Sequence, residues 1–105
     1  MISERDGQLF ITGAMNQQTV PELQPEGELL VVQADRVVNL AGIEAVDSSA
    51  VAVLLSWKRA ALAAGKQLSI VSAPAAFVSL ASLYGVTPFL FPELSADGSR
   101  TSVQH

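Results

Sequence analysis

Apolar and polar positions alternate near the start of the chain in a pattern typical of a β-strand. Between Gly7 and Met15, Leu9 and Ile11 alternate with other side chains, and glycine bounds the segment. Strict alternation places every second side chain on the same face of a sheet. This segment therefore predicts a strand, with a weaker strand before it.

The following residues, 16–35, have no long regular pattern. They contain Pro21, Pro25 and Gly27, which interrupt a helix or a strand. We expect only a short helix here, opening near Thr19 and Pro21, because proline is favoured in the first helical turn.

Two further strands are predicted downstream. The segment from 35 to 43 carries the β-branched pair Val37 and Val38 followed by Leu40, which is typical of a buried strand, and Gly42 is expected to end it. Residues 66–73 alternate again and predict the next strand. Pro74 then opens a helix that Gly85 ends, a last short element lies within 86–94, and residues 95–105 are expected to fray.

The strongest helical pattern is "AVDSSAVAVLLSWKRAALAAGK", residues 45–66. Asp47 or Ser48 is suited to cap the first turn and Gly65 to end the last one, so a helix is expected over Ser48 to Ala64. With about 100° between successive residues, one face is apolar and is expected to be core, with the tryptophan as its anchor. It contains Ala50, Val51, Leu54, Trp57, Ala61 and Leu62.

The opposite face of this helix is small and weakly polar, with Leu55 at its edge. A helix face without long charged side chains lets another protein approach closely, so we expect this face to be a docking surface. A phosphate on Ser48 would also be favoured there, at the positive end of the helix dipole. Plain capping and an idle surface remain open as the simpler interpretation. The candidate partner-binding residues are Ser48, Ser49, Ala52, Leu55, Ser56 and Arg59.

Alternating strands and helices imply an α/β fold in which helices pack on a sheet. At 105 residues, the chain is long enough for one core, and about four strands are expected. We place the domain at residues 1–94 and a polar tail at 95–105. Tyr84, just before the glycine that ends the second long helix, is expected to be a packing residue.

Composition limits the possible partners. Only 15% of residues are charged, against about 25% in typical domains, which fits a surface partly covered by another protein. The net charge of -4 gives no basic surface for nucleic acid or an anionic membrane. The sequence contains no stretch of about 20 apolar residues, the length that a membrane-spanning helix needs. A soluble cytoplasmic protein is therefore expected.

The residue types needed for most catalytic sites are missing. The sequence has no cysteine, and its single histidine, His105, is the last residue of the polar tail, so a serine nucleophile has no obvious base. Neither a phosphate-binding loop nor a dinucleotide motif occurs. Asp35, Glu44 and Asp47 are too scattered to predict a metal site. We therefore expect no enzyme activity, no metal and no cofactor.

The segment "VVNLAGIEAVDSSAVAVLL" resembles the central signature of STAS domains, in which a strand leads into Asp-Ser/Thr-Ser/Thr-Gly at the start of an apolar helix. The downstream run "AGKQLSIVSAPAAFVSLASLYGV" is similar to the MlaB-like STAS subunit of the Mla phospholipid-transport ABC system of Gram-negative bacteria. The resemblance covers roughly residues 36–91. It implies a STAS-like single domain, with helices packed against a mixed sheet.

This resemblance implies two possible functions. In the MlaB-like branch, the residue matching Ser48 lies where the STAS subunit docks on the cytoplasmic ATPase, supporting assembly and activity of the transporter and its permease complex, and hence outer-membrane lipid asymmetry. Such a protein would be peripheral to the inner membrane through its partner. In the related anti-sigma factor antagonists, the matching serine is phosphorylated by an anti-sigma factor serine kinase.

Two residues depart from the STAS signature. The glycine after the serine pair is Ala50 here, and the aspartate at the end of the preceding strand is Asn39. Alanine is harmless in a first helical turn, where no positive φ is needed. The change to alanine weakens the similarity to the kinase-regulated antagonists. The Asp-Ser-Ser-Ala form, Trp57 and the Leu-Tyr-Gly-Val run together favour the transporter branch.

Overall fold

Four β-strands and four α-helices follow one another in residues 1–91, the part of the chain that the computed structural model describes. They are β1 (Ile2–Arg5), β2 (Gln8–Met15), α1 (Val20–Val31), β3 (Arg36–Val46), α2 (Ser48–Ala63), β4 (Leu68–Val71), α3 (Ala75–Leu83) and α4 (Thr87–Leu90). The strands β1, β2 and β4 and the helices α2 and α3 lie where the sequence predicts them. The expected tail at 95–105 lies outside the described residues, so the domain boundary at 94 remains a prediction.

The strands form one mixed sheet in the order β1-β2-β3-β4. The β1/β2 pair is antiparallel, and the β2/β3 and β3/β4 pairs are parallel. Val38 of β3 lies opposite both Leu9 of β2 and Ile70 of β4, and all three side chains are buried. The expected α/β class, the mixed sheet and its four strands are thus confirmed.

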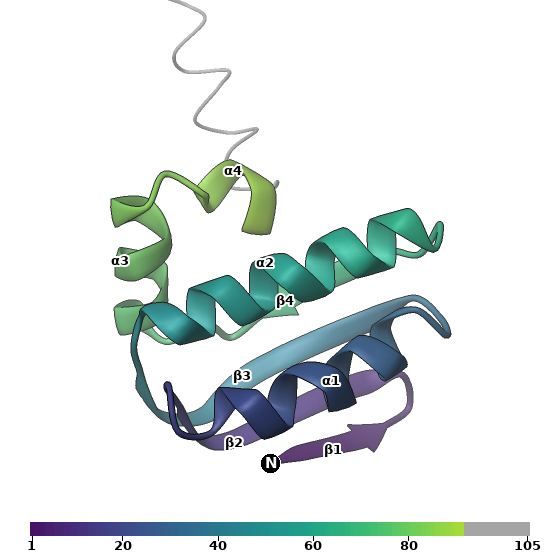
Figure 1. Cartoon of the computed structure of the whole chain (residues 1–105), viewed down its shortest axis with the longest axis horizontal. Helices are drawn as coiled ribbons and strands as arrows, with labels where there is room; N and C mark the ends of the chain where they lie inside the picture. Colours follow the sequence, from purple (N-terminus) through teal and green to yellow (C-terminus); the bar gives the residue numbers. More distant parts are fainter. Residues whose placement is uncertain (92–105) are drawn as a thin grey trace, which may run out of the picture.

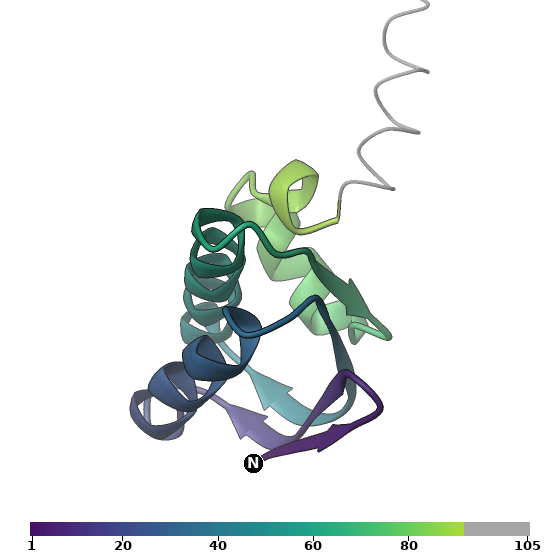
Figure 2. The same cartoon turned by 90° about the vertical axis from the view of Figure 1, so that its right-hand side faces the viewer.

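The two long helices α1 and α2 lie side by side over the sheet (Figure 1). Figure 2 shows α3 and α4 next to α2, on the side away from α1. The core between helices and sheet includes Trp57 of α2, which is fully buried, and Phe77 of α3, whose ring meets Phe91 edge to face. As a result, α2 is packed from several directions and has only one side facing outward.

The helix α1 is longer than its sequence predicts, because neither Pro25 nor Gly27 ends it. Pro25 is exposed on α1 and costs the helix the one backbone hydrogen bond that its missing N–H would donate. Gly27 is buried against the indole of Trp57, whose Nε1 donates to the carbonyl oxygen of Gln24 at 2.9 Å. A Cβ on Gly27 would lie 2.1 Å from Cζ2 of Trp57. The glycine therefore makes room for the tryptophan, and the prediction of a break was wrong.

The strand β3 also continues past its predicted end. Gly42 pairs with Thr12 of β2, and the parallel ladder runs on to Val46 opposite Met15, with register shifts along the way. A Cβ on Gly42 would lie 2.8 Å from Cγ2 of Thr12, so glycine permits a close approach of the two strands at this point. This extension carries the chain directly to the start of α2.

Candidate functional site

The start of α2 is fixed by the carboxylate of Asp47. This residue has an extended backbone, and its Oδ1 accepts a hydrogen bond from the backbone N–H of Ser49 at 2.8 Å. Its Oδ2 accepts from the backbone N–H of Gln17, in the loop after β2, at 3.4 Å. Asp47 is the helix cap, as expected. Ser48 was also predicted as a cap, but it is the first residue inside the helix, and its side chain is free to face outward.

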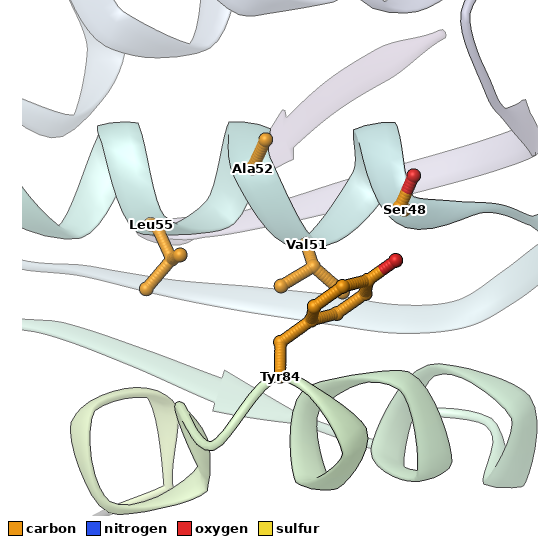
Figure 3. Close-up of a pocket in the computed structure, with 5 residues that line it drawn as sticks. All are labelled: Ser48, Val51, Ala52, Leu55 and Tyr84. Carbon is orange, nitrogen blue, oxygen red and sulfur yellow. The ribbon is translucent and has the colours of Figure 1, made fainter.

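A shallow pocket of about 370 Å³ lies between the first two turns of α2 and the end of α3. Ser48, Ala52 and Leu55, three of the six predicted partner-binding residues, line it together with Val51 and Tyr84. Figure 3 shows Val51 and Leu55 pointing from α2 towards the tyrosine side of the pocket. The structure thus brings these three predicted residues to one hollow in the surface.

Tyr84 is a residue of this pocket that sequence reasoning assigned to packing. Its side chain is 54% exposed, and its ring extends alongside α2 with the hydroxyl at the Ser48 end (Figure 3). Tyr84 caps the C-terminal end of α3, and the chain then turns through Gly85, which has a φ of +71°. The turn holds the ring outside the core. The assignment failed because periodicity within α3 does not report where the chain goes after the helix ends.

Three of the six predicted residues lie apart from the pocket. The hydroxyl oxygen of Ser56 accepts a hydrogen bond from Nε2 of Gln24 at 3.2 Å, which places it on the side of α2 that faces α1. Ser49 is half-buried and lies seven residues, or two helical turns, before Ser56 on that same side. Arg59 is exposed, one turn beyond Leu55.

Leu62 is a second residue of α2 for which the sequence-based prediction was wrong. The sequence placed it in the core, but its side chain is 56% exposed. At about 100° per residue it lies only about 20° around the helix from Leu55 and well away from Trp57. The outward side of α2 is therefore a continuous row of four exposed residues and the half-buried Leu55. We call this row the α2 stripe: Ser48, Ala52, Leu55, Arg59 and Leu62.

The other five residues predicted for the core face of α2 are buried as expected. They are Ala50, Val51, Leu54, Trp57 and Ala61. The buried side of α2 therefore packs in the core, and the α2 stripe faces away from it.

The described residues contain no group of three potential metal ligands. No helix in residues 1–91 has the length and apolar character to cross a bilayer. The pocket presents two hydroxyl groups beside aliphatic and aromatic carbon. Such a surface is suited to contact with another molecule.

Comparison with protein families decides the class of the chain. A family model described as "Mlab, STAS domain" matches residues 2–92, which extends the resemblance seen in residues 36–91 to nearly the whole described structure. The chain belongs to this STAS family. The MlaB-type STAS family is generally a non-catalytic accessory domain.

Other comparisons add the fold alone. No curated protein sequence matches this STAS domain significantly. A solved structure titled "Crystal Structure Analysis of Mglu" is similar over 71% of this chain and 19% of that one, with 19% identity and a TM-score of 0.57. The STAS domain therefore spans about a fifth of that structure, and the similarity concerns its fold.

The two departures from the STAS signature are accommodated without strain. Ala50 is fully buried in the first turn of α2. The side-chain oxygen of Asn39 accepts from the backbone N–H of Ala41 at 2.9 Å, and its Nδ2 donates to Gln8 of β2 at 3.4 Å. Ala50 thus contributes to the core, and Asn39 links β3 to β2.

Proposed function

We propose that this STAS domain is a non-enzymatic accessory subunit that binds the cytoplasmic ATPase of an Mla-type phospholipid ABC transporter and supports its assembly and activity. Docking occurs through the outward side of α2. The observation that carries the proposal is the pocket at the start of α2, which Ser48, Ala52 and Leu55 line together with the exposed Tyr84. Through the ATPase and its permease, the subunit would be peripheral to the inner membrane and contribute to outer-membrane lipid asymmetry.

The surface around the pocket has the properties of an interface centre. The side chains of Ser48 and Ala52 are short, so the backbone of a partner can approach α2 closely. Aromatic residues and arginine are enriched in interface cores, and acidic residues are depleted. Tyr84 and Arg59 are both exposed here, and the α2 stripe contains no acidic residue.

The decisive experiment places a long cation in the middle of this surface. Ala52→Arg should abolish binding to the purified ATPase, because the new guanidinium must either hold the partner away or lose its water on docking. Ala34→Arg is the matched control, since Ala34 is exposed on the turn after α1. Co-purification of the ATPase with Ala52→Arg at the wild-type ratio would show that α2 is not the docking surface.

A second candidate function is a phosphorylation-controlled anti-sigma factor antagonist. It is favoured by one observation: the Ser48 side chain is exposed at the first position of a 16-residue helix, where a kinase has access and a phosphate meets free backbone N–H groups. Phosphorylation adds about -1.5 to -2 charges at neutral pH.

The two functions separate at Ser48. For an ATPase-binding subunit, Ser48→Ala should bind almost as well as wild type. For a phosphorylated antagonist, Ser48→Ala and Ser48→Asp should have opposite phenotypes, and the intact mass of the protein from cells should show a phosphorylated fraction. Equal behaviour of the two variants, with no phosphate found, removes the antagonist.

A further inference from the structure

We infer that the partner contributes an α-helix that lies along the α2 stripe, with one aliphatic side chain in the Tyr84 pocket and one carboxylate facing Arg59. This inference rests on the proposed function and specifies which chemistry of the ATPase the STAS domain recognises. It goes beyond docking at Ser48 because it assigns the shape, the anchor and the charge of the partner segment.

The shape follows from the spacing of the α2 stripe. Its residues are separated by four, three, four and three positions, from Ser48 through Leu55 to Leu62. At about 100° per residue they fall within a sector of about 80° and extend over about 21 Å of the helix. Spacing of alternately three and four residues forms a packing seam between two helices where the positions are apolar, as Ala52, Leu55 and Leu62 are here. A partner helix of about four turns matches this length.

The anchor follows from the walls of the pocket. Val51, Ala52 and Leu55 form one side and the ring of Tyr84 the other, so most of the lining is carbon. Figure 3 shows the two hydroxyl groups, of Ser48 and Tyr84, at the same end. A volume of about 370 Å³ is at the lower end of the range for small-molecule sites. The pocket is open to solvent, so an aliphatic side chain of a partner can enter it and cover the exposed part of the ring without filling the space.

The charge follows from Arg59. It is the single charged residue of the α2 stripe, it is exposed, and it forms no ion pair within residues 1–91. The whole chain has a net charge of -4, so this arginine is a local cation on an acidic protein. Arg59 lies one turn from Leu55 on α2. A carboxylate about one turn from the aliphatic anchor on the partner helix would therefore be placed to pair with Arg59.

The same charge argues against a second copy of this chain as the occupant. A twofold interface brings the same surface together with itself. Two α2 stripes packed against each other would offer each Arg59 only serine, alanine, leucine or another Arg59. Neither arginine would meet a carboxylate from the α2 stripe of the other copy, whereas a partner of different sequence can supply one.

The test uses the full-length chain and the purified ATPase. Leu55→Ala, Tyr84→Ala and Arg59→Glu should each weaken binding at least tenfold, while Ala34→Arg leaves it unchanged. The loss caused by Arg59→Glu should shrink as salt is raised, since an exposed ion pair is screened. Thermal unfolding of each variant shows that it is folded, so that lost binding reflects the surface.

Crosslinking then identifies the partner segment. Tyr84→p-benzoylphenylalanine, irradiated in the complex, should attach to an aliphatic residue on a helix of the ATPase with an aspartate or glutamate about one turn away. A crosslink to a second copy of this chain, or to a loop or strand of the ATPase, overturns the inference.

The results also distinguish this inference from the proposed function. If Ala52→Arg abolishes binding while Leu55→Ala, Tyr84→Ala and Arg59→Glu all remain within twofold of wild type, docking on α2 stands and the anchored helix is wrong. If the wild-type chain does not bind the ATPase at all, the proposed function itself fails.

Discussion

Replacing Gly27 by alanine inserts a methyl group where the indole of Trp57 lies. The added Cβ would lie 2.1 Å from Cζ2 and 2.3 Å from Cε2 of the ring. Ordinary contact begins near 3.4 Å, so the ring or the helix must retreat by more than 1 Å. Trp57 is fully buried, and its Nε1 donates to Gln24 of α1 at 2.9 Å, which leaves the ring little freedom to move.

Two opposing effects determine the size of the change. Alanine is a better helix former than glycine by about 1 kcal/mol, which favours the variant. Overpacking a core costs about 1–3 kcal/mol, and displacing the indole strands a buried N–H at a cost of about 1–3 kcal/mol. We expect the clash to dominate and the free energy of unfolding to fall by roughly 2 kcal/mol. For a domain of this size the Tm would then fall by roughly 10 °C.

The assay is urea and thermal unfolding followed by far-UV circular dichroism, which does not depend on the tryptophan. Glu26→Gly, at the exposed neighbouring position, calibrates the helix propensity of α1 and should cost about 1 kcal/mol. Gly27→Ala is then repeated in a Trp57→Phe background, where the atoms that clash are absent.

In that background Gly27→Ala should be neutral or stabilising, because only its gain in helix propensity remains. An unchanged or higher Tm for Gly27→Ala in the wild-type chain would refute the packing argument. So would an equal loss of stability in both backgrounds, since the loss then has no connection with the indole.

Three further substitutions test other contacts by the same unfolding measurements. Asp47→Ala should cost about 1 kcal/mol, because the N–H of Ser49 loses its cap; no change would mean that water replaces the carboxylate. Arg36→Ala should cost about 2 kcal/mol, since the buried guanidinium donates to the carbonyl of Leu30 and pairs with Glu4, and a loss below about 0.5 kcal/mol would contradict this. Leu62→Ala should cost less than about 1 kcal/mol because the side chain is largely exposed. A loss of about 2 kcal/mol or more would show that Leu62 is a core residue after all.

Much of the fold is predictable because apolar residues recur in the sequence with the period of a strand or of a helix. Alternation from Leu9 to Ile11 and the helical pattern after Asp47 give β2 and α2 almost to the residue. The predictions were wrong where contact with a residue far away in the sequence determines the structure at a given position. Gly27 breaks helices in general, but here Trp57, thirty positions later, requires it within α1. Gly42 similarly lies inside β3 because Thr12 of β2 approaches it closely.

The candidate site shows the same division. The face of α2 with Ser48, Ala52 and Leu55 is predictable from the helical period. The second wall of the pocket is not, because Tyr84 comes from α3, and no periodicity relates two helices that meet only through tertiary packing. The exposure of Leu62 has the same cause, since burial depends on which side of α2 its neighbours cover.

The contact between Gly27 and Trp57 has a consequence for how such a protein can change over evolution. It fixes α2 from its buried side, while partner recognition is assigned to the opposite side of the same helix. If docking occurs there as proposed, substitutions at the exposed Ala52 or Arg59 can alter which protein is bound without disturbing the buried residues on which folding depends. A duplicated copy could acquire a new partner in a few steps, each leaving a folded domain on which selection can act.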